Sequence, residues 1–114
     1  MGDLIKQKIL DYIRNNGDIS YSEIEDVMTA AGFEWKGNLC ACSDQNNNVI
    51  FWEGWNRAAL SLISDMMKNG EIVREPCHVL IYLIDGKCLN LPLVKRNTEY
   101  KTDHWLPCIF VLGK

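Results

Sequence analysis

The residues NRAALSLISDMMKNG, numbers 56–70, carry the pattern of an amphipathic helix that stops at a glycine. Their apolar side chains recur at helical spacing and share one stripe, which consists of Ala59, Leu60, Ile63, Met66 and Met67. Gly70 is the residue type with which many helices end, because glycine adopts the left-handed conformation at little cost. The pattern predicts a helix from Asn56 to Asn69.

Two further helices are predicted earlier in the chain. The segment from Leu4 to Asn15 has apolar residues at helical spacing, and Asn16-Gly17 follows as a stop signal. Ser22, with Glu25 three residues later, forms a capping-box pattern at the head of the second helix. Gly32 ends that helix, so the sequence predicts three helices.

A β-hairpin is predicted between the second and third helices, at about residues 36–54. Two apolar runs, Leu39 to Cys42 and Val49 to Trp52, flank a polar stretch with many turn-forming residues, Ser43 to Asn48. The predicted hairpin therefore has a long exposed loop.

Strand-like segments follow the third helix. Their lengths and their β-branched or aromatic residues predict strands at Glu71 to Arg74, His78 to Ile84, Lys87 to Val94 and Trp105 to Leu112. Both central residues of a type I′ turn need positive φ, which Asp85-Gly86 tolerates. A tight hairpin is expected there.

This order of elements predicts one α+β domain over residues 1–114, with three helices plus antiparallel β-hairpins in a winged helix-turn-helix arrangement. In that arrangement the third helix enters the major groove of DNA and the hairpin contacts the backbone or minor groove. A helix-turn-helix joins its second and third helices by a turn of three or four residues, whereas residues 33–55 separate them here. The insertion is either a decoration of the domain or a sign that the arrangement does not read DNA.

The charge is distributed unevenly along the 114 residues. The chain has 12 basic and 15 acidic residues, a net charge of −3, which argues against nonspecific coating of nucleic acid. Residues 1–53 hold four basic and nine acidic side chains, whereas residues 54–114 hold eight basic and six acidic ones. A surface that meets phosphate is therefore expected in the carboxy-terminal half, and the alternative is a solvated basic strand end.

The hydrophobic segments and the cysteines predict a cytoplasmic protein without a membrane partner. The longest apolar runs, Val79 to Ile84 and Cys108 to Leu112, are far shorter than the roughly 20 residues of a membrane span. The amino terminus lacks the pattern of a signal peptide. Five cysteines are an odd count without the spacing of a secreted disulfide framework.

Several segments carry a resemblance to a known family. They are Val49 to Asn56, Tyr82 to Gly86, Leu91 to Arg96, Tyr100 to Thr102 and Trp105 to Pro107. Together they resemble a family of small uncharacterised proteins from phages and pathogenicity islands of Gram-positive bacteria. The resemblance covers most of the chain and implies a mobile-element origin and a small accessory role, without catalytic residues to assign.

A zinc site is the sharpest chemical hypothesis. Cys40, Cys42, Cys77 and His78 would form a Cys₃His site if the inserted hairpin packed on the strand after the third helix. Paired zinc ligands usually have two to four residues between them, whereas only Ala41 lies between Cys40 and Cys42. Buried free cysteines are also common in cytosolic proteins, so the prediction is that no cofactor is bound. The number of cysteines and histidines in the chain equally permits other sets of zinc ligands, which would include Cys88, Cys108 or His104.

Catalysis is not predicted. Nothing in the sequence shows that His78 or His104 stands beside a cysteine nucleophile in a solvent-accessible site, and there is no glycine-rich phosphate loop. The four tryptophans have two interpretations: stacking of Trp55 or Trp105 on unpaired bases, or packing in the core and across strands. Core packing is favoured.

The first functional hypothesis is a small regulator that binds double-stranded DNA through the third helix and the basic carboxy-terminal segments. The expected nucleic-acid-binding residues are Arg57, Lys68, Arg74, Lys87, Lys95, Arg96 and Lys101. The alternative is an interaction protein that inhibits a host nucleic-acid enzyme, of the anti-CRISPR or anti-restriction kind. In this alternative the acidic residues between Asp18 and Asp26 would occupy the basic channel of the host enzyme.

Overall fold

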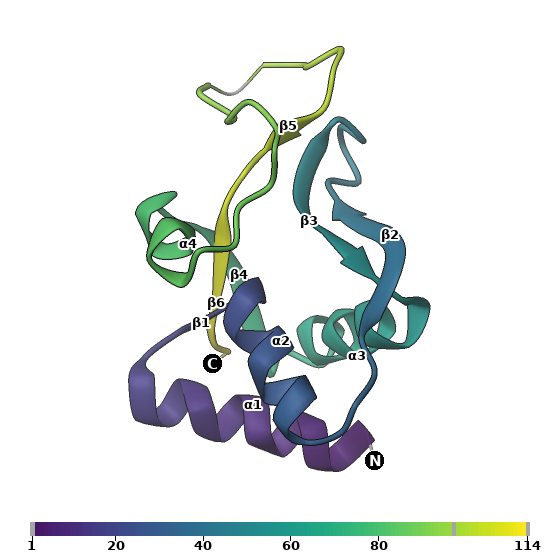
Figure 1. The fold of residues 1–114 in the computed structure, drawn as a ribbon, viewed down its shortest axis with the longest axis vertical. Coiled ribbons are helices and arrows are strands. Elements are labelled where there is room, and N and C mark those ends of the chain that lie inside the picture. The colour runs from purple at the N-terminus through teal and green to yellow at the C-terminus, as the bar shows by residue number, and fades with distance from the viewer. Residues whose placement is uncertain (1, 97, 114) are drawn as a thin grey trace.

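The computed structural model describes residues 2–96 and 98–113 and shows a compact α+β protein (Figure 1). The elements follow one another as α1 (Gly2–Asn16), β1 (Ile19–Ser20), α2 (Tyr21–Ala30), β2 (Lys36–Cys42), β3 (Val49–Trp55), α3 (Arg57–Lys68), β4 (Ile72–Pro76), α4 (Leu80–Asp85), β5 (His104–Trp105) and β6 (Cys108–Leu112). The predicted α+β class is confirmed.

The first sheet is antiparallel and has the strand order β1-β6-β4. Its central strand comes from the carboxy-terminal end of the chain, while its edge strands follow α1 and α3. Phe110 of β6 lies opposite Ile19 on one side and Arg74 on the other. The last strand therefore ties together segments from both halves of the sequence.

The second sheet has the order β2-β3-β5 and contains the inserted hairpin. β2 and β3 are antiparallel, and β5 pairs in parallel with β3 through His104 and Trp105. Only Leu106 and Pro107 separate β5 from β6, so the chain passes directly from the second sheet to the first. In Figure 1 the three long helices occupy the lower half, and the loop before β5 lies at the top.

The three predicted helices and the hairpin at residues 36–54 are confirmed, with small shifts at their ends. The start of α3 shows why the sequence indicates it clearly. The side-chain oxygen of Asn56 accepts a hydrogen bond from the backbone N–H of Ala59 at 2.9 Å, which satisfies one unpaired donor of the first helical turn. The apolar stripe of α3 then buries Ala59, Leu62, Ile63 and Met66.

The capping box of α2 is formed by residues other than the predicted pair. Ser20, and not Ser22, caps the helix, and its hydroxyl oxygen accepts a hydrogen bond from the N–H of Glu23 at 3.0 Å. The Glu23 carboxylate accepts the N–H of Ser20 in return. Both serines satisfy the same spacing rule, and the two-residue strand β1 places Ser20 at the helix start.

The predicted strand from His78 to Ile84 and the hairpin at Asp85-Gly86 are wrong, because this segment forms α4. Gly86 has φ of 74° and ends the helix, while no described residue other than glycine has positive φ. A type I′ turn would need positive φ at Asp85 as well. A short apolar run without alternation does not distinguish a strand from a helix, and Asp-Gly is compatible with a helix end as well as with a hairpin turn.

The predicted strands after this point are also revised. Residues 87–94 form no regular strand, apart from an isolated bridge between Leu93 and Trp105. The predicted strand from Trp105 to Leu112 is divided between β5 and β6, because Pro107 interrupts it at the crossing between the sheets. Proline lacks the N–H that a continuous ladder requires.

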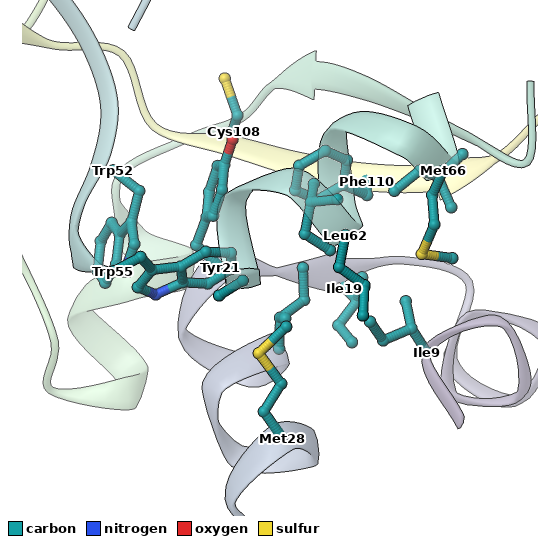
Figure 2. Close-up of a cluster of buried hydrophobic side chains, with 14 of the residues drawn as sticks. Ile9, Ile19, Tyr21, Met28, Trp52, Trp55, Leu62, Met66, Cys108 and Phe110 are labelled. Atoms are coloured by element: carbon teal, nitrogen blue, oxygen red, sulfur yellow. The ribbon is translucent and has the colours of Figure 1, made fainter. Parts of the chain in front are cut away.

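One hydrophobic core lies between the helices and both sheets (Figure 2). Aliphatic side chains of α1, β1 and α3 gather at one end of the view, and Tyr21, Trp52 and Trp55 gather at the other. Trp105, at 1% exposure, belongs to the same aromatic group: its ring centroid lies 6.0 Å from that of Trp52. The core interpretation of Trp55 and Trp105 is confirmed, since neither ring is accessible for stacking on a base.

A buried carboxylate, Glu25, joins three parts of the chain. Its side chain is on α2 and is 4% exposed. One of its oxygens accepts hydrogen bonds from the indole N–H groups of Trp52 and Trp55, each at 2.8 Å. The other lies 3.1 Å from the ammonium group of Lys87, which follows α4. Charged groups are rarely buried unless they are paired, and here every partner comes from a different element than the carboxylate itself.

Across residues 2–96 and 98–113, no helix combines the length and the apolar composition that a membrane crossing requires.

Candidate nucleic-acid interface

The exposed stripe of α3 presents two of the predicted basic residues. Arg57 and Lys68 are both exposed, and they are eleven positions apart along the helix. This spacing returns to the same helix face after about three turns, or roughly 16 Å. Ser61 lies on that face between them, and Asp65 lies beside it as the one acidic group of the helix. The stripe therefore offers two separated cations with a small polar side chain between them.

The inserted hairpin forms a groove with α3. A cavity of about 380 Å³ is lined by Leu39 and Cys40 of the hairpin and by Arg57, Leu60, Ser61 and Ser64 of the helix. Arg57 thus stands where the exposed stripe meets this groove. The hairpin borders the candidate surface and does not cover it, since Arg57 and Ser61 stay exposed.

Arg74 of β4 is half-buried and engaged within the molecule. Its guanidinium lies 3.7 Å from the ring centroid of Phe51 and donates a hydrogen bond to the hydroxyl of Tyr21 at 3.3 Å. Burial raises the pKa of Tyr21 to about 12, although the nearby Arg74 charge opposes the shift. The structure thus places Arg74 in a role that ties the hairpin to the first sheet.

Lys87 is also engaged within the molecule. Its ammonium group lies 3.1 Å from a carboxylate oxygen of Glu25 and 3.4 Å from one of Asp26. Burial alone would lower the pKa of Lys87, but the hydrogen bond and the charge of Glu25 outweigh it, and the pKa lies above its ordinary value. A phosphate would have to compete with two carboxylates for this side chain.

The other three predicted cations, Lys95, Arg96 and Lys101, are exposed in the loop between α4 and β5. Tyr100 organises this loop: its hydroxyl oxygen accepts the backbone N–H of Lys95 at 3.0 Å and that of Arg96 at 3.2 Å. The bond from Lys95 is the main reason why the pKa of Tyr100 lies below its usual value. The ring of Tyr100 packs on His104, with 4.0 Å between centroids.

The seven predicted residues therefore do not form one surface. Arg57 and Lys68 lie on α3, and Lys95, Arg96 and Lys101 lie in the loop at the far end of the molecule (Figure 1). The remaining two side chains have internal partners. Counting charges along the sequence does not reveal such pairing, because Lys87 and its partner Glu25 are 62 residues apart, and Arg74 and its partner Tyr21 are 53 residues apart.

The four candidate zinc ligands are not brought into one site. In residues 2–96 and 98–113, no three side chains of His, Cys, Asp or Glu gather closely enough to hold a metal ion. Cys40 and Cys42 are neighbours on β2, whereas Cys77 lies near Asp18 and Cys108. Burial raises the pKa of Cys77 to about 11, which favours the thiol over the thiolate that binds metals. The ring Nδ1 of His78 accepts the N–H of Leu80 at 3.1 Å, at the start of α4.

The acidic residues between Asp18 and Asp26 form no continuous surface. Glu25 is buried, and Glu23 is half-buried in the capping box, where it also accepts the hydroxyl of Tyr12. That hydrogen bond is the main reason why the pKa of Tyr12 rises to about 12. Asp26 is the one of these four carboxylates that is exposed, since Asp18 is half-buried too.

Sequence reasoning missed an exposed apolar ridge on α4. Leu80, Leu83 and Ile84 are 55%, 54% and 83% exposed, and their spacing places them on one face of the helix. The i, i+3, i+4 spacing of these three residues could have indicated one face of a helix. The same residues belong to a continuous apolar run that also fits a strand. Contiguous exposed apolar side chains of this size mark interaction surfaces more often than isolated ones do.

No protein family model, no curated protein and no solved structure matches the chain.

Proposed function

We propose that this protein is a winged-helix module that binds duplex DNA, acting as a small regulator of a mobile genetic element. The order of its elements carries the proposal. In a winged helix one strand follows the first helix, two strands follow the third, and the last strand is central in the antiparallel sheet. The order α1-β1-α2-α3-β4-β6 with the sheet order β1-β6-β4 has this form once the hairpin β2-β3, the short helix α4 and the two-residue strand β5 are set aside. The mobile-element origin rests on the sequence resemblance alone.

In this proposal α3 is the recognition helix. Its exposed stripe carries Arg57 and Lys68, which suit contacts to phosphate or to guanine edges. The segment between β4 and β6 takes the position of the wing, and its exposed cations Lys95, Arg96 and Lys101 suit contacts to the DNA backbone. Arg74 and Lys87 are omitted because their internal partners hold them.

The test is fluorescence anisotropy with a labelled duplex of mixed sequence, titrated over a series of salt concentrations. Phosphate contacts release counterions, so affinity is expected to fall steeply as salt rises. Arg57→Ala and Lys68→Ala are each expected to reduce the slope of log affinity against log salt by about 1.

Lys8→Ala is the matched control, because Lys8 is an exposed lysine of α1 and the variant has the same change in charge. Its affinity and its salt slope are expected to equal those of the unaltered protein. Absence of binding at low salt, or equal losses in Lys8→Ala and Lys68→Ala, would contradict the role of α3.

A second candidate function, binding of a host protein, is favoured by the α4 ridge. Ile84 is followed directly by Asp85, whose charge acts on Tyr12 together with those of Glu23 and Asp18. An apolar ridge beside carboxylates fits a partner surface that is apolar with a basic rim. Such a contact would centre on α4, with Asp18 and Glu23 of the acidic stretch that the sequence suggested close to Asp85.

The experiment compares host proteins captured by the unaltered protein and by Leu83→Ser/Ile84→Ser. Both side chains are largely exposed, so the variant is expected to stay folded. A captured protein is purified, and its affinity for the two forms is measured. It supports the proposal if it binds the variant at least about tenfold more weakly than it binds the unaltered protein. Equal binding to both forms would contradict the assignment of the ridge.

A further inference from the structure

A cavity of about 430 Å³ lies between the hairpin loop and the loop before β5. Its volume is in the range of small-molecule binding sites. Four apolar side chains line it: Val49, Phe51, Val94 and Leu106. Because they come from three separate segments, the cavity exists only in the folded chain.

Backbone hydrogen bonds hold the walls of this cavity in place. The N–H of Leu106 donates to the carbonyl of Ile50 at 2.9 Å, and the N–H of Val94 donates to the carbonyl of Trp105 at 2.8 Å. The side-chain amide of Asn48 donates to the carbonyl of Tyr100 at 2.8 Å, which joins the two loops directly. A ligand would therefore meet a formed site, and little binding free energy would be lost in ordering it.

The charge of the lining residues has one sign. Lys95 and Arg96 both line the cavity, and no carboxylate side chain of residues 2–96 and 98–113 does. The Tyr100 hydroxyl accepts the N–H groups of both residues and so holds their backbone at the cavity wall. The other described lining residues are apolar, amide-bearing or hydroxyl-bearing. Two adjacent cations in such a site favour an anion, and arginine in particular pairs well with phosphate oxygens.

Asn46 contributes an unused hydrogen-bond donor. Its Oδ1 accepts the N–H of Asn48 at 2.9 Å, which fixes the orientation of the amide. Asn46 is one of the residues that line the cavity, and its Nδ2 is buried without a hydrogen-bond partner among residues 2–96 and 98–113. A buried donor without a partner is unfavourable. A ligand acceptor that reaches the Asn46 amide would satisfy this donor.

We propose that this cavity binds the phosphorylated nucleoside unit of a nucleotide. The phosphate is placed at Lys95 and Arg96, and the flat base lies on the apolar floor around Phe51 and Leu106. The amides of Asn46 and Gln45 then meet the polar edge of the base or sugar. This inference goes beyond duplex binding by α3 and does not depend on it.

Isothermal titration calorimetry with nucleotides is the direct test. AMP, GMP, CMP and UMP serve as probes, and at least one is expected to bind. The nucleoside alone and inorganic phosphate alone are each expected to bind at least about tenfold more weakly than the nucleotide that contains both. The proposal is wrong if none of the four binds at millimolar concentration, or if the nucleoside binds as tightly as its monophosphate.

Two variants test the assigned residues. Lys95→Gln/Arg96→Gln is expected to weaken nucleotide binding at least about tenfold, whereas Lys101→Gln, in the same loop but outside the cavity lining, leaves it unchanged. Asn46→Asp keeps the acceptor for Asn48 but replaces the donor with a negative charge, so binding is expected to be lost while the circular dichroism spectrum is retained. Unchanged binding in either cavity variant would overturn the assignment.

The nucleotide unit has two sources, which a further comparison separates. A short single strand with a 5′-phosphate is titrated beside the same strand without it. Preference for the phosphorylated strand over free nucleotide assigns the site to strand ends, and binding of the free nucleotide alone assigns it to a small-molecule ligand. Either result supports binding of a phosphorylated nucleoside unit in the cavity. Arg57→Ala is expected to weaken duplex binding while nucleotide binding stays intact, so failure of the duplex-binding proposal can be distinguished from failure of the nucleotide proposal.

Discussion

Replacement of Glu25 by alanine is expected to lower the free energy of unfolding by about 3–5 kcal/mol. The substitution removes the one carboxylate that accepts both indole N–H groups of Trp52 and Trp55 and pairs with Lys87. The two indole donors then have to stay unpaired inside the protein or draw water into the core, whereas Lys87, with a 40% exposed side chain, keeps Asp26 as a partner. Since small domains have total stabilities of about 5–15 kcal/mol, this loss would leave little margin. Chemical denaturation followed by circular dichroism measures it.

Two further variants keep this prediction testable if Glu25→Ala fails to fold. Glu25→Gln retains an oxygen that accepts from the indoles but loses the charge that pairs with Lys87, so we expect a smaller loss, about 1–3 kcal/mol. Asp26→Asn removes the other, 74% exposed partner of Lys87, and we expect a change within about 0.5 kcal/mol. Equal losses for Glu25→Gln and Asp26→Asn would show that the buried contacts of Glu25 contribute little.

The helices of this protein are predictable because their signals are local. The Asn56 cap, the apolar stripe and Gly70 all lie within 15 residues, and each agrees with the others. Residues 78–86 lack such agreement, because an apolar run followed by Asp-Gly fits both a hairpin arm and a helix with a glycine at its end. The tertiary contact that selects the helix joins positions far apart in the sequence: Tyr82 donates its hydroxyl to the carbonyl of Cys108 and accepts the N–H of Tyr21.

The candidate site was less predictable, since charge patterns do not record which charges are paired. Lys87 and Lys95 look alike in the sequence, yet one is paired with the carboxylates of α2 and the other is exposed beside a cavity. The unpaired amide of Asn46 and the exposed face of α4 depend on how the loops are placed. Residue type and spacing therefore indicated the exposed cations of α3 and of the loop, but not which neighbouring cations were already engaged.

The inserted hairpin is part of the core, and this gives the second large expected effect. Trp105→Ala is expected to cost about 3–5 kcal/mol, because the ring is 1% exposed and contacts both halves of the molecule. Its indole N–H donates to the carbonyl of Phe51 in the hairpin at 3.1 Å, and its ring centroid lies 5.2 Å from that of Tyr82 in α4. Loss of the ring would leave a large cavity where β5 joins the hairpin to the first sheet.

Trp35→Ala is the matched control for this prediction. The Trp35 ring is half-buried beside the hairpin and donates to the hydroxyl of Thr29 at 2.9 Å, so we expect its removal to cost about 1 kcal/mol. Circular dichroism follows both unfolding curves, since fluorescence would change with the deleted indole. A Trp105→Ala variant as stable as Trp35→Ala would mean that the Trp105 ring is not held in the core. The hairpin would then be a decoration, and the Trp105 ring would again be a candidate for stacking on unpaired bases.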